Sequence, residues 1–204
     1  MWSRGIFRRE RTAWAALGLY VVCLYSTLSL AFDLYVALYA KLGRSTVSTS
    51  MNLAFALVGL ALLLWAIRRY RPSATGFAVL LLIGAVLFAC LKWLDVPAKR
   101  FHFFEYSVLA FLAFDALRFR LTRWSLALVS IGLVGLVGLG DEAIQAALPR
   151  RHFGFVDLGV NLTAGILTVL FIMQVVREPN YPWGSRRVHS TGGEGSSGAT
   201  RRDS

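Results

Sequence analysis

The amino-acid sequence predicts an all-α integral membrane protein, a polytopic bundle of about six transmembrane helices. The chain is 56% hydrophobic and 16% charged, with a mean hydropathy of +0.58. Its charged residues stand in short groups between long apolar runs, whereas a soluble domain needs a continuous polar shell. Because lipid offers the backbone no hydrogen-bond partners, apolar runs of this kind are expected to be helices. A soluble two-layer domain is therefore not favoured.

Six apolar runs predict the helices. They lie at about residues 13–31, 47–67, 74–94, 102–117, 124–148 and 155–176. Most approach or exceed the ~20 residues that a helix needs to cross ~30 Å of hydrocarbon. The first run is longer than the about 7–15 residues of a signal-peptide core and ends without a convincing cleavage site, so it is interpreted as a retained helix.

Smaller features complete the organisation of the chain. Glycines at 132, 135, 138 and 140 predict that the fifth helix is central, because small residues let membrane helices approach closely. Cys23 and Cys90 lie within apolar runs and are interpreted as small core residues. Residues 1–177 are predicted to be the transmembrane domain. Residues 178–204, rich in Gly, Ser and Arg, are predicted to be a disordered cytoplasmic tail.

The basic residues predict the orientation in the membrane. Of the 22 Lys and Arg residues, 15 lie in the N-terminus, in the loops after the second and fourth runs, and in the C-terminal tail. The remaining seven lie in or beside the loops near 33–46, 95–101 and 149–154: Lys41, Arg44, Lys92, Lys99, Arg100, Arg150 and Arg151. The positive-inside rule then places the protein in the cell membrane with both termini in the cytoplasm. The net charge of +11 is explained by membrane lipids as partners and not by nucleic acid.

Polar residues gather where three predicted helices meet the outer face. They open the fourth run, close the fifth and open the sixth, with i, i+3 and i+4 spacings that put them on common helix faces. Ionisable residues in a membrane segment cost roughly 2.5–3.5 kcal/mol each, so they are kept for pairing or for function. The candidate ligand-binding residues are Lys99, His102, Glu105, Tyr106, Glu142, Gln145, Arg151, Asp157 and Asn161.

Each of these residues also has a simpler interpretation. His102 and Tyr106 could be interfacial side chains at the headgroups. Glu105 and Glu142 could pair with Arg150 or Arg151 and only hold helices together. Asp157 could serve as a cap at the positive end of the sixth helix. Their convergence from three separate segments favours a shared site.

The motifs resemble the VanZ-like membrane protein family over about residues 95–170. They read K99-x-x-H102-F-x-E105-Y106, then D141-E142-x-x-Q145-x-x-x-P149-x-R151, then D157-x-x-x-N161-x-x-x-G165. Ala98 and Ile144 stand where the family often carries an acidic residue and a histidine. The family is named for a protein associated with low-level teicoplanin resistance, and most members have no established activity. The resemblance implies that the polar residues above are the family's characteristic positions.

Three functional hypotheses follow. The first is a cell-envelope protein whose outward-facing pocket binds an anionic lipid headgroup, a cell-wall precursor or another anionic surface ligand, with a link to glycopeptide resistance; Lys99, Arg150 and Arg151 would contact the anion.

The second is a membrane enzyme acting on a lipid-linked substrate. Its catalytic candidates are His102, Glu105, Glu142 and Asp157, with His102 as general acid or base. No recognised nucleophile motif is present, no cofactor is implied, and a metal site is not favoured because His152 lies at no ligand-like spacing.

The third is a small transporter. Transporters place ionisable residues near the middle of the membrane, whereas here the cytoplasmic half offers only Asp115, which is expected to pair with Arg118. The transporter hypothesis is therefore the least favoured.

The predicted orientation can be tested by cysteine labelling. In a chain with its two native cysteines replaced, a cysteine at Ser45 should react with a membrane-impermeant thiol reagent in intact cells, and one at Ser196 should react only after lysis. Labelling of position 196 in intact cells would reverse the orientation and move the polar site to the cytoplasm.

Overall fold

The computed structural model describes the backbone of residues 7–93, 97–148 and 153–176, and within these ranges the chain is helical without a strand. The all-α class is confirmed. The tail predicted for 178–204 lies outside the described residues. The elements are α1 (Glu10–Leu42), α2 (Arg44–Tyr70), α3 (Ala74–Trp93), α4 (Pro97–Leu117), α5 (Arg123–Ala147), α6 (Phe155–Phe171) and the π-helix η1 (Ile172–Val176).

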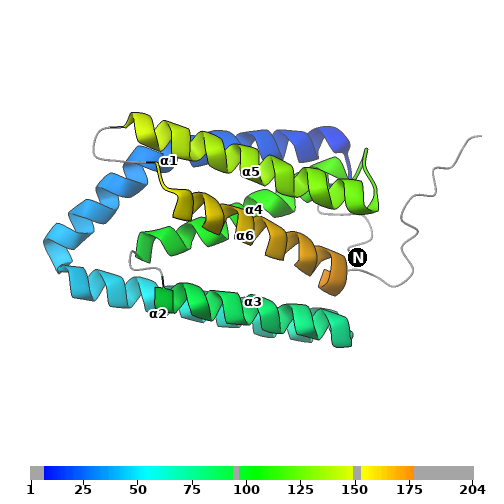
Figure 1. The fold of residues 1–204 in the computed structure, drawn as a ribbon, viewed down its shortest axis with the longest axis horizontal. Coiled ribbons are helices and arrows are strands. Elements are labelled where there is room, and N and C mark those ends of the chain that lie inside the picture. The colour runs from blue at the N-terminus through cyan, green and yellow to red at the C-terminus, as the bar shows by residue number, and fades with distance from the viewer. Residues whose placement is uncertain (1–6, 94–96, 149–152, 177–204) are drawn as a thin grey trace, which may run out of the picture.

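Successive helices run in alternating directions along the long axis of the molecule (Figure 1). One end, here called the polar end, holds Gly43, the start of α4, the end of α5 and the start of α6. The opposite end, here called the basic end, holds the start of α1 and the turns at 71–73 and 118–122. The three polar segments therefore meet at one end of the molecule, as the sequence predicts.

Several helices are suited to a membrane. Within the described ranges, three are long and apolar enough to cross one: α2, α5 and Phe155–Val176, which joins α6 to η1. The bent α1 makes a fourth if it counts as one span. Leu19, Leu128 and Leu136 are each about two-thirds exposed, at 66%, 68% and 66%. Because a soluble monomer rarely exposes so much apolar surface, these faces are ones that lipid or protein would cover.

The loop predicted near 33–46 is wrong. Helix α1 continues through this segment to Leu42, and Gly43 alone separates it from α2. Gly43 has φ 82° and ψ 147°, a conformation that side-chain-bearing residues rarely adopt, so it makes the corner. The helix reaches the corner through a 47° bend between Glu10–Leu28 and Asp33–Leu42. Just before the bend, the Ser26 and Thr27 hydroxyls donate to carbonyls one turn earlier, a pattern that bends helices.

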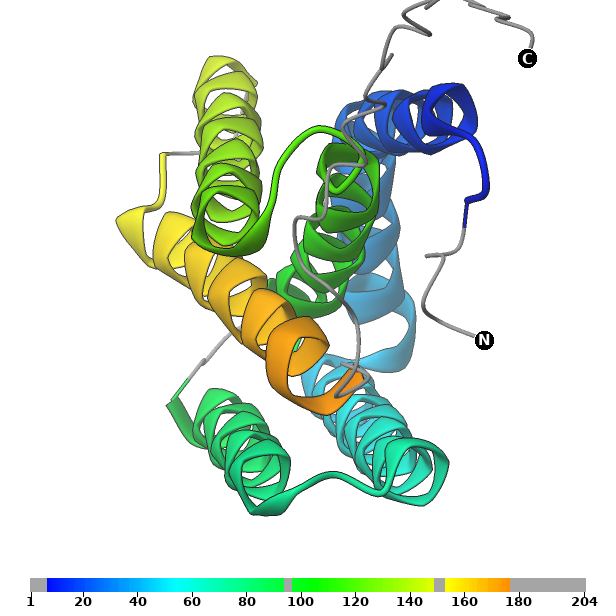
Figure 2. The ribbon, with the colours of Figure 1, turned by 90° about the vertical axis from the view of Figure 1, so that its right-hand side faces the viewer.

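The central helix is α4, and the prediction that the fifth helix is central is wrong. Helix α4 contacts α1, α2, α5 and α6 and lies between them in the end view (Figure 2). Leu109, Ala110 and Ala113 on α4 are fully buried. Two glycines of α5 serve its contact with α6: a Cβ on Gly135 would lie 3.0 Å from Leu162, and one on Gly138 would lie 3.4 Å from the Asn161 Cβ. On α6, a Cβ on Gly165 would come within 2.9 Å of Val134.

At the basic end, an ion pair joins α4 to the N-terminal segment. The Arg118 Nε lies 2.7 Å from the Asp115 Oδ1, which confirms the predicted pair. Arg118 also donates to the Phe7 carbonyl at 2.7 Å, and the Phe7 N–H donates to Asp115 at 3.2 Å. The Asp115 and Arg118 side chains therefore hold the N-terminal segment against α4.

Candidate functional site

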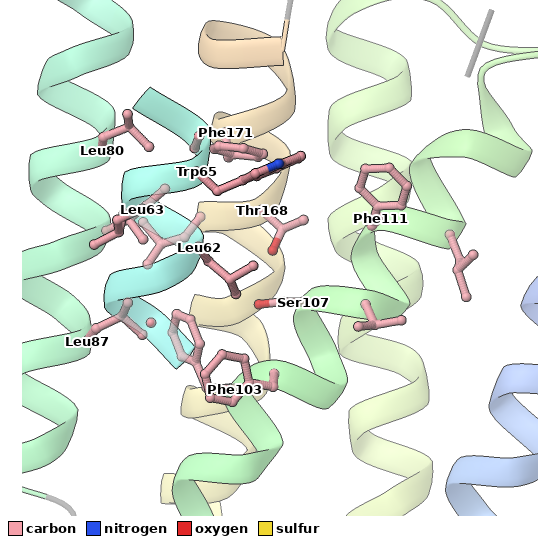
Figure 3. Close-up of a pocket in the computed structure, with 17 residues that line it drawn as sticks. Leu62, Leu63, Trp65, Leu80, Leu87, Phe103, Ser107, Phe111, Thr168 and Phe171 are labelled. Atoms are coloured by element: carbon pink, nitrogen blue, oxygen red, sulfur yellow. The ribbon is translucent and has the colours of Figure 1, made fainter. Parts of the chain in front are cut away.

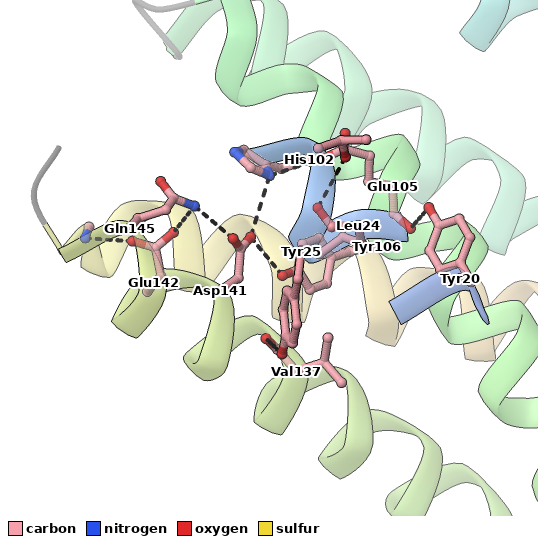
Figure 4. Close-up of polar contacts among 12 residues, drawn as sticks. Tyr20, Leu24, Tyr25, His102, Glu105, Tyr106, Val137, Asp141, Glu142 and Gln145 are labelled. Atoms are coloured by element: carbon pink, nitrogen blue, oxygen red, sulfur yellow. Dashed lines mark hydrogen bonds and ion pairs between the residues drawn. The ribbon is translucent and has the colours of Figure 1, made fainter. Parts of the chain in front are cut away.

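Asp141 lies at the centre of the polar cluster and is fully buried. The Tyr106 hydroxyl of α4 donates to its Oδ2 at 2.8 Å, and the Gln145 side chain donates to its Oδ1 at 2.9 Å (Figure 4). Gln145 stands four residues after Asp141 on α5, so one helix turn aligns the two. Both oxygens of this buried carboxylate are thus hydrogen-bonded, as burial requires.

His102 stands between Asp141 and the exposed part of the cluster. Its Nδ1 lies 3.2 Å from the Glu105 Oε2 and 4.0 Å from the Asp141 Oδ2. The His102 side chain is 16% exposed, whereas the Glu105 side chain is 45% exposed. The imidazole therefore faces two carboxylates with one nitrogen, and its other nitrogen points away from them toward the polar end (Figure 4).

Glu142 and Asp157 meet at Gly154, where the chain enters α6. The fully buried Glu142 accepts a hydrogen bond from the Gly154 N–H at 2.8 Å. A Cβ on Gly154 would lie 2.6 Å from the Asp157 Oδ2, so a larger residue there would displace the Asp157 carboxylate. Asp157 lies in the first turn of α6, where the helix dipole favours a negative charge, but no side-chain hydrogen bond caps this helix.

Asn161 is the innermost polar residue of α6 and is fully buried. It lies one turn beyond Asp157 and packs against Gly138, whose Cβ position would also be 3.4 Å from the Tyr106 ring. Neither side-chain atom of Asn161 has a hydrogen-bond partner among the described residues. A buried amide without partners costs about 1–3 kcal/mol, so this position is held for a reason other than packing.

Two tyrosines of α1 donate hydrogen bonds to the helices that carry the cluster. The Tyr20 hydroxyl donates to the Glu105 carbonyl at 2.9 Å, and the Tyr25 hydroxyl donates to the Val137 carbonyl at 2.8 Å. They fasten α1 to α4 and α5 at the level of the site. Sequence reasoning missed them, and no local spacing pointed to them.

Sequence reasoning also gave Asp141 no role of its own. The spacing of Asp141 and Gln145 by one turn was the signal that could have found it. The structure brings together seven of the nine candidates: His102, Glu105, Tyr106, Glu142, Gln145, Asp157 and Asn161. Arg151 and the side chain of Lys99 lie outside the described residues.

Within the described part of the chain, the site contains four carboxylates and one histidine. No group of three His, Cys, Asp or Glu side chains there could hold a metal ion. Comparisons of the chain with protein-family profiles, with curated proteins and with solved structures found no match. The function has to be argued from the residues themselves.

The Tyr106–Asp141 hydrogen bond can be tested by Tyr106→Phe. This change leaves a buried carboxylate one donor short, so it should lower the free energy of unfolding by about 1–3 kcal/mol. Tyr20→Phe is the matched control, because its carbonyl acceptor keeps a hydrogen bond within α4 and should cost about 1 kcal/mol or less. Thermal unfolding in detergent measures both, and equal losses would show that Asp141 does not depend on Tyr106.

Proposed function

We propose that this chain is a multi-pass protein of the cell membrane that spans the bilayer with its six α-helices. The exposed apolar faces of α1, α2 and α5 support membrane burial. The alternating helix directions support repeated crossing (Figure 1). The excess of basic residues in the segments at the basic end supports a cytoplasmic location for that end, with the polar end outside.

We further propose that the polar cluster binds an anionic lipid headgroup or another anionic ligand of the cell envelope. The observation that carries this proposal is that buried polar side chains from α4, α5 and α6 meet at one end of an otherwise apolar bundle. Asp141 and Glu142 fasten α5 to α4 and to the start of α6. A cluster with a stability role alone would not need the exposed Glu105 or the unpartnered Asn161 amide.

The charge balance supports an anionic ligand. Four carboxylates at one end of a membrane protein need cations beside them, because unpaired buried charges are costly. The sequence supplies Lys99 next to the start of α4, and Arg150 and Arg151 between α5 and α6. In this proposal the carboxylates orient these cations, and the cations bind phosphate or carboxylate groups of the ligand.

The motifs also support membership of the VanZ-like family. Eight of the residues that carry the resemblance lie together in the fold: His102, Glu105, Tyr106, Asp141, Glu142, Gln145, Asp157 and Asn161. A link to glycopeptide susceptibility follows from this membership as a proposal, since a site at the outer surface could bind a cell-wall precursor.

Anion binding can be tested with sn-glycerol 1-phosphate, a headgroup without acyl chains. The purified full-length protein should bind it saturably in calorimetric titration, and Arg151→Gln should weaken binding about tenfold or more, the effect of losing a charge-assisted hydrogen bond. Arg8→Gln, at the basic end, removes the same charge and should change nothing. Glu142→Gln and Arg151→Gln should destabilise the protein non-additively if they share one site. Absence of saturable binding in the wild type would contradict the proposal.

A second candidate function is favoured by one observation: the Nδ1 of His102 is backed by Glu105 and Asp141 while its other nitrogen points toward the polar end. A histidine backed by carboxylates suits proton transfer, as in a membrane enzyme acting on a lipid-linked substrate.

Activity against a polyprenyl diphosphate separates the two functions. An enzyme would release phosphate from it, and His102→Gln would abolish release while glycerol phosphate still bound. If the wild type releases no phosphate but binds glycerol phosphate, only the binding function is supported.

A further inference from the structure

Helix α4 also borders an apolar cavity, here called the groove, on a face other than that of the polar cluster. It has a volume of about 380 Å³ and is bounded by α2 and α3 on one side and by α4 and α6 on the other (Figure 3). On α4 its wall includes Phe103, Ser107 and Phe111, which follow one another at a spacing of one turn. Because His102 and Tyr106 face α5, the cavity is separate from the polar cluster.

The lining of this groove is hydrocarbon. Leucine, isoleucine and phenylalanine side chains make most of it, and the polar atoms along it are the Ser107 and Thr168 hydroxyls and the Trp65 indole nitrogen (Figure 3). Two hydroxyls and an indole cannot neutralise a charged or strongly polar ligand. The groove therefore suits an apolar ligand.

The dimensions of the groove select the kind of apolar occupant. Its wall on α4 extends from Phe103 to Leu112, which at 1.5 Å per residue is about 14 Å, close to the ~15 Å of hydrocarbon in one leaflet. A single extended acyl chain matches this length.

The basic end of the groove fits an anionic headgroup. Trp65, which lines the groove and is 48% exposed, is followed one turn later by the exposed residues Arg68 and Arg69. The Arg69 guanidinium lies over the Tyr70 ring at 5.5 Å. The Trp65 ring also lies 5.5 Å from the Tyr70 ring in an edge-to-face pair. Trp and Tyr with nearby Arg are the residues that membrane proteins place at the headgroup level.

From these observations we propose that the groove binds one acyl chain of an anionic phospholipid from the leaflet at the basic end. The lipid phosphate contacts Arg68 and Arg69, and its chain runs past Trp65 toward Phe103. The proposal rests on the membrane location of the bundle but not on ligand binding by the polar cluster.

Native mass spectrometry of the full-length protein in detergent tests this proposal, with long-chain phosphatidylglycerol and phosphatidylcholine as probes. The wild type should retain phosphatidylglycerol. Ser107→Phe fills the groove and should reduce the bound fraction about tenfold. Thr168→Leu is a milder second variant that should reduce it less. Leu128→Phe enlarges an exposed side chain on α5 and should leave binding unchanged.

Charge variants test the headgroup contact. The double change Arg68→Gln and Arg69→Gln should weaken phosphatidylglycerol binding to the level of phosphatidylcholine, whereas Arg8→Gln with Arg9→Gln, of equal charge, should not. The folded Ser107→Phe protein should still bind sn-glycerol 1-phosphate as the wild type does, so a failure of the polar-cluster proposal would be seen separately. Undiminished phosphatidylglycerol binding by folded Ser107→Phe and Thr168→Leu proteins, or equal binding of both lipids by the wild type, would overturn the inference.

Discussion

The structure depends on how the bundle accommodates the buried carboxylate of Asp141. A carboxylate without partners in an apolar interior is strongly unfavourable, so its two oxygens fix where donors must lie. Gln145 comes from the same helix, but Tyr106 comes from α4, and its hydroxyl sets the axial position of α4 against α5. Once Tyr106 is fixed, His102 one turn before it is carried to the same carboxylate. The Tyr106–Asp141 hydrogen bond thereby fixes the position of α4 along α5, which apolar contacts alone would not determine.

The small residues of α5 and α6 make this arrangement possible. Gly138 lets the Tyr106 ring and Asn161 approach the α5 backbone, and Gly165 leaves room for Val134. These close approaches bring α4, α5 and α6 together around the polar residues. The helices α2 and α3 lie side by side (Figure 2), and the apolar groove is bounded by them, by α4 and by α6. Tight packing holds the polar residues in place, and loose packing admits an apolar chain.

Local signals in the sequence account for the parts of this structure that could be predicted. Apolar runs located the helices, and turn spacings put His102 beside Glu105 and Tyr106, because both signals are set by residues close together in the chain. Tyr20 reaches a carbonyl 85 residues away and Tyr25 one 112 residues away, and nothing near either tyrosine indicates this. The continuation of α1 was missed for a related reason: polar residues between 33 and 46 suggested a loop, whereas the glycine at 43 alone makes the turn.

Helix α4 shows why site and fold cannot be separated in this protein. It is not among the helices that are long and apolar enough to cross a membrane by themselves, since its opening turns carry Arg100, His102 and Glu105. It is nevertheless the most enclosed helix, and neighbours on all sides cover its alanines and Leu109. Arg100 and most of His102 are tolerated on α4 because they are buried against neighbouring parts of the protein. Both the polar cluster and the groove therefore use α4 as a wall, and a residue that changes its position would alter both sites together.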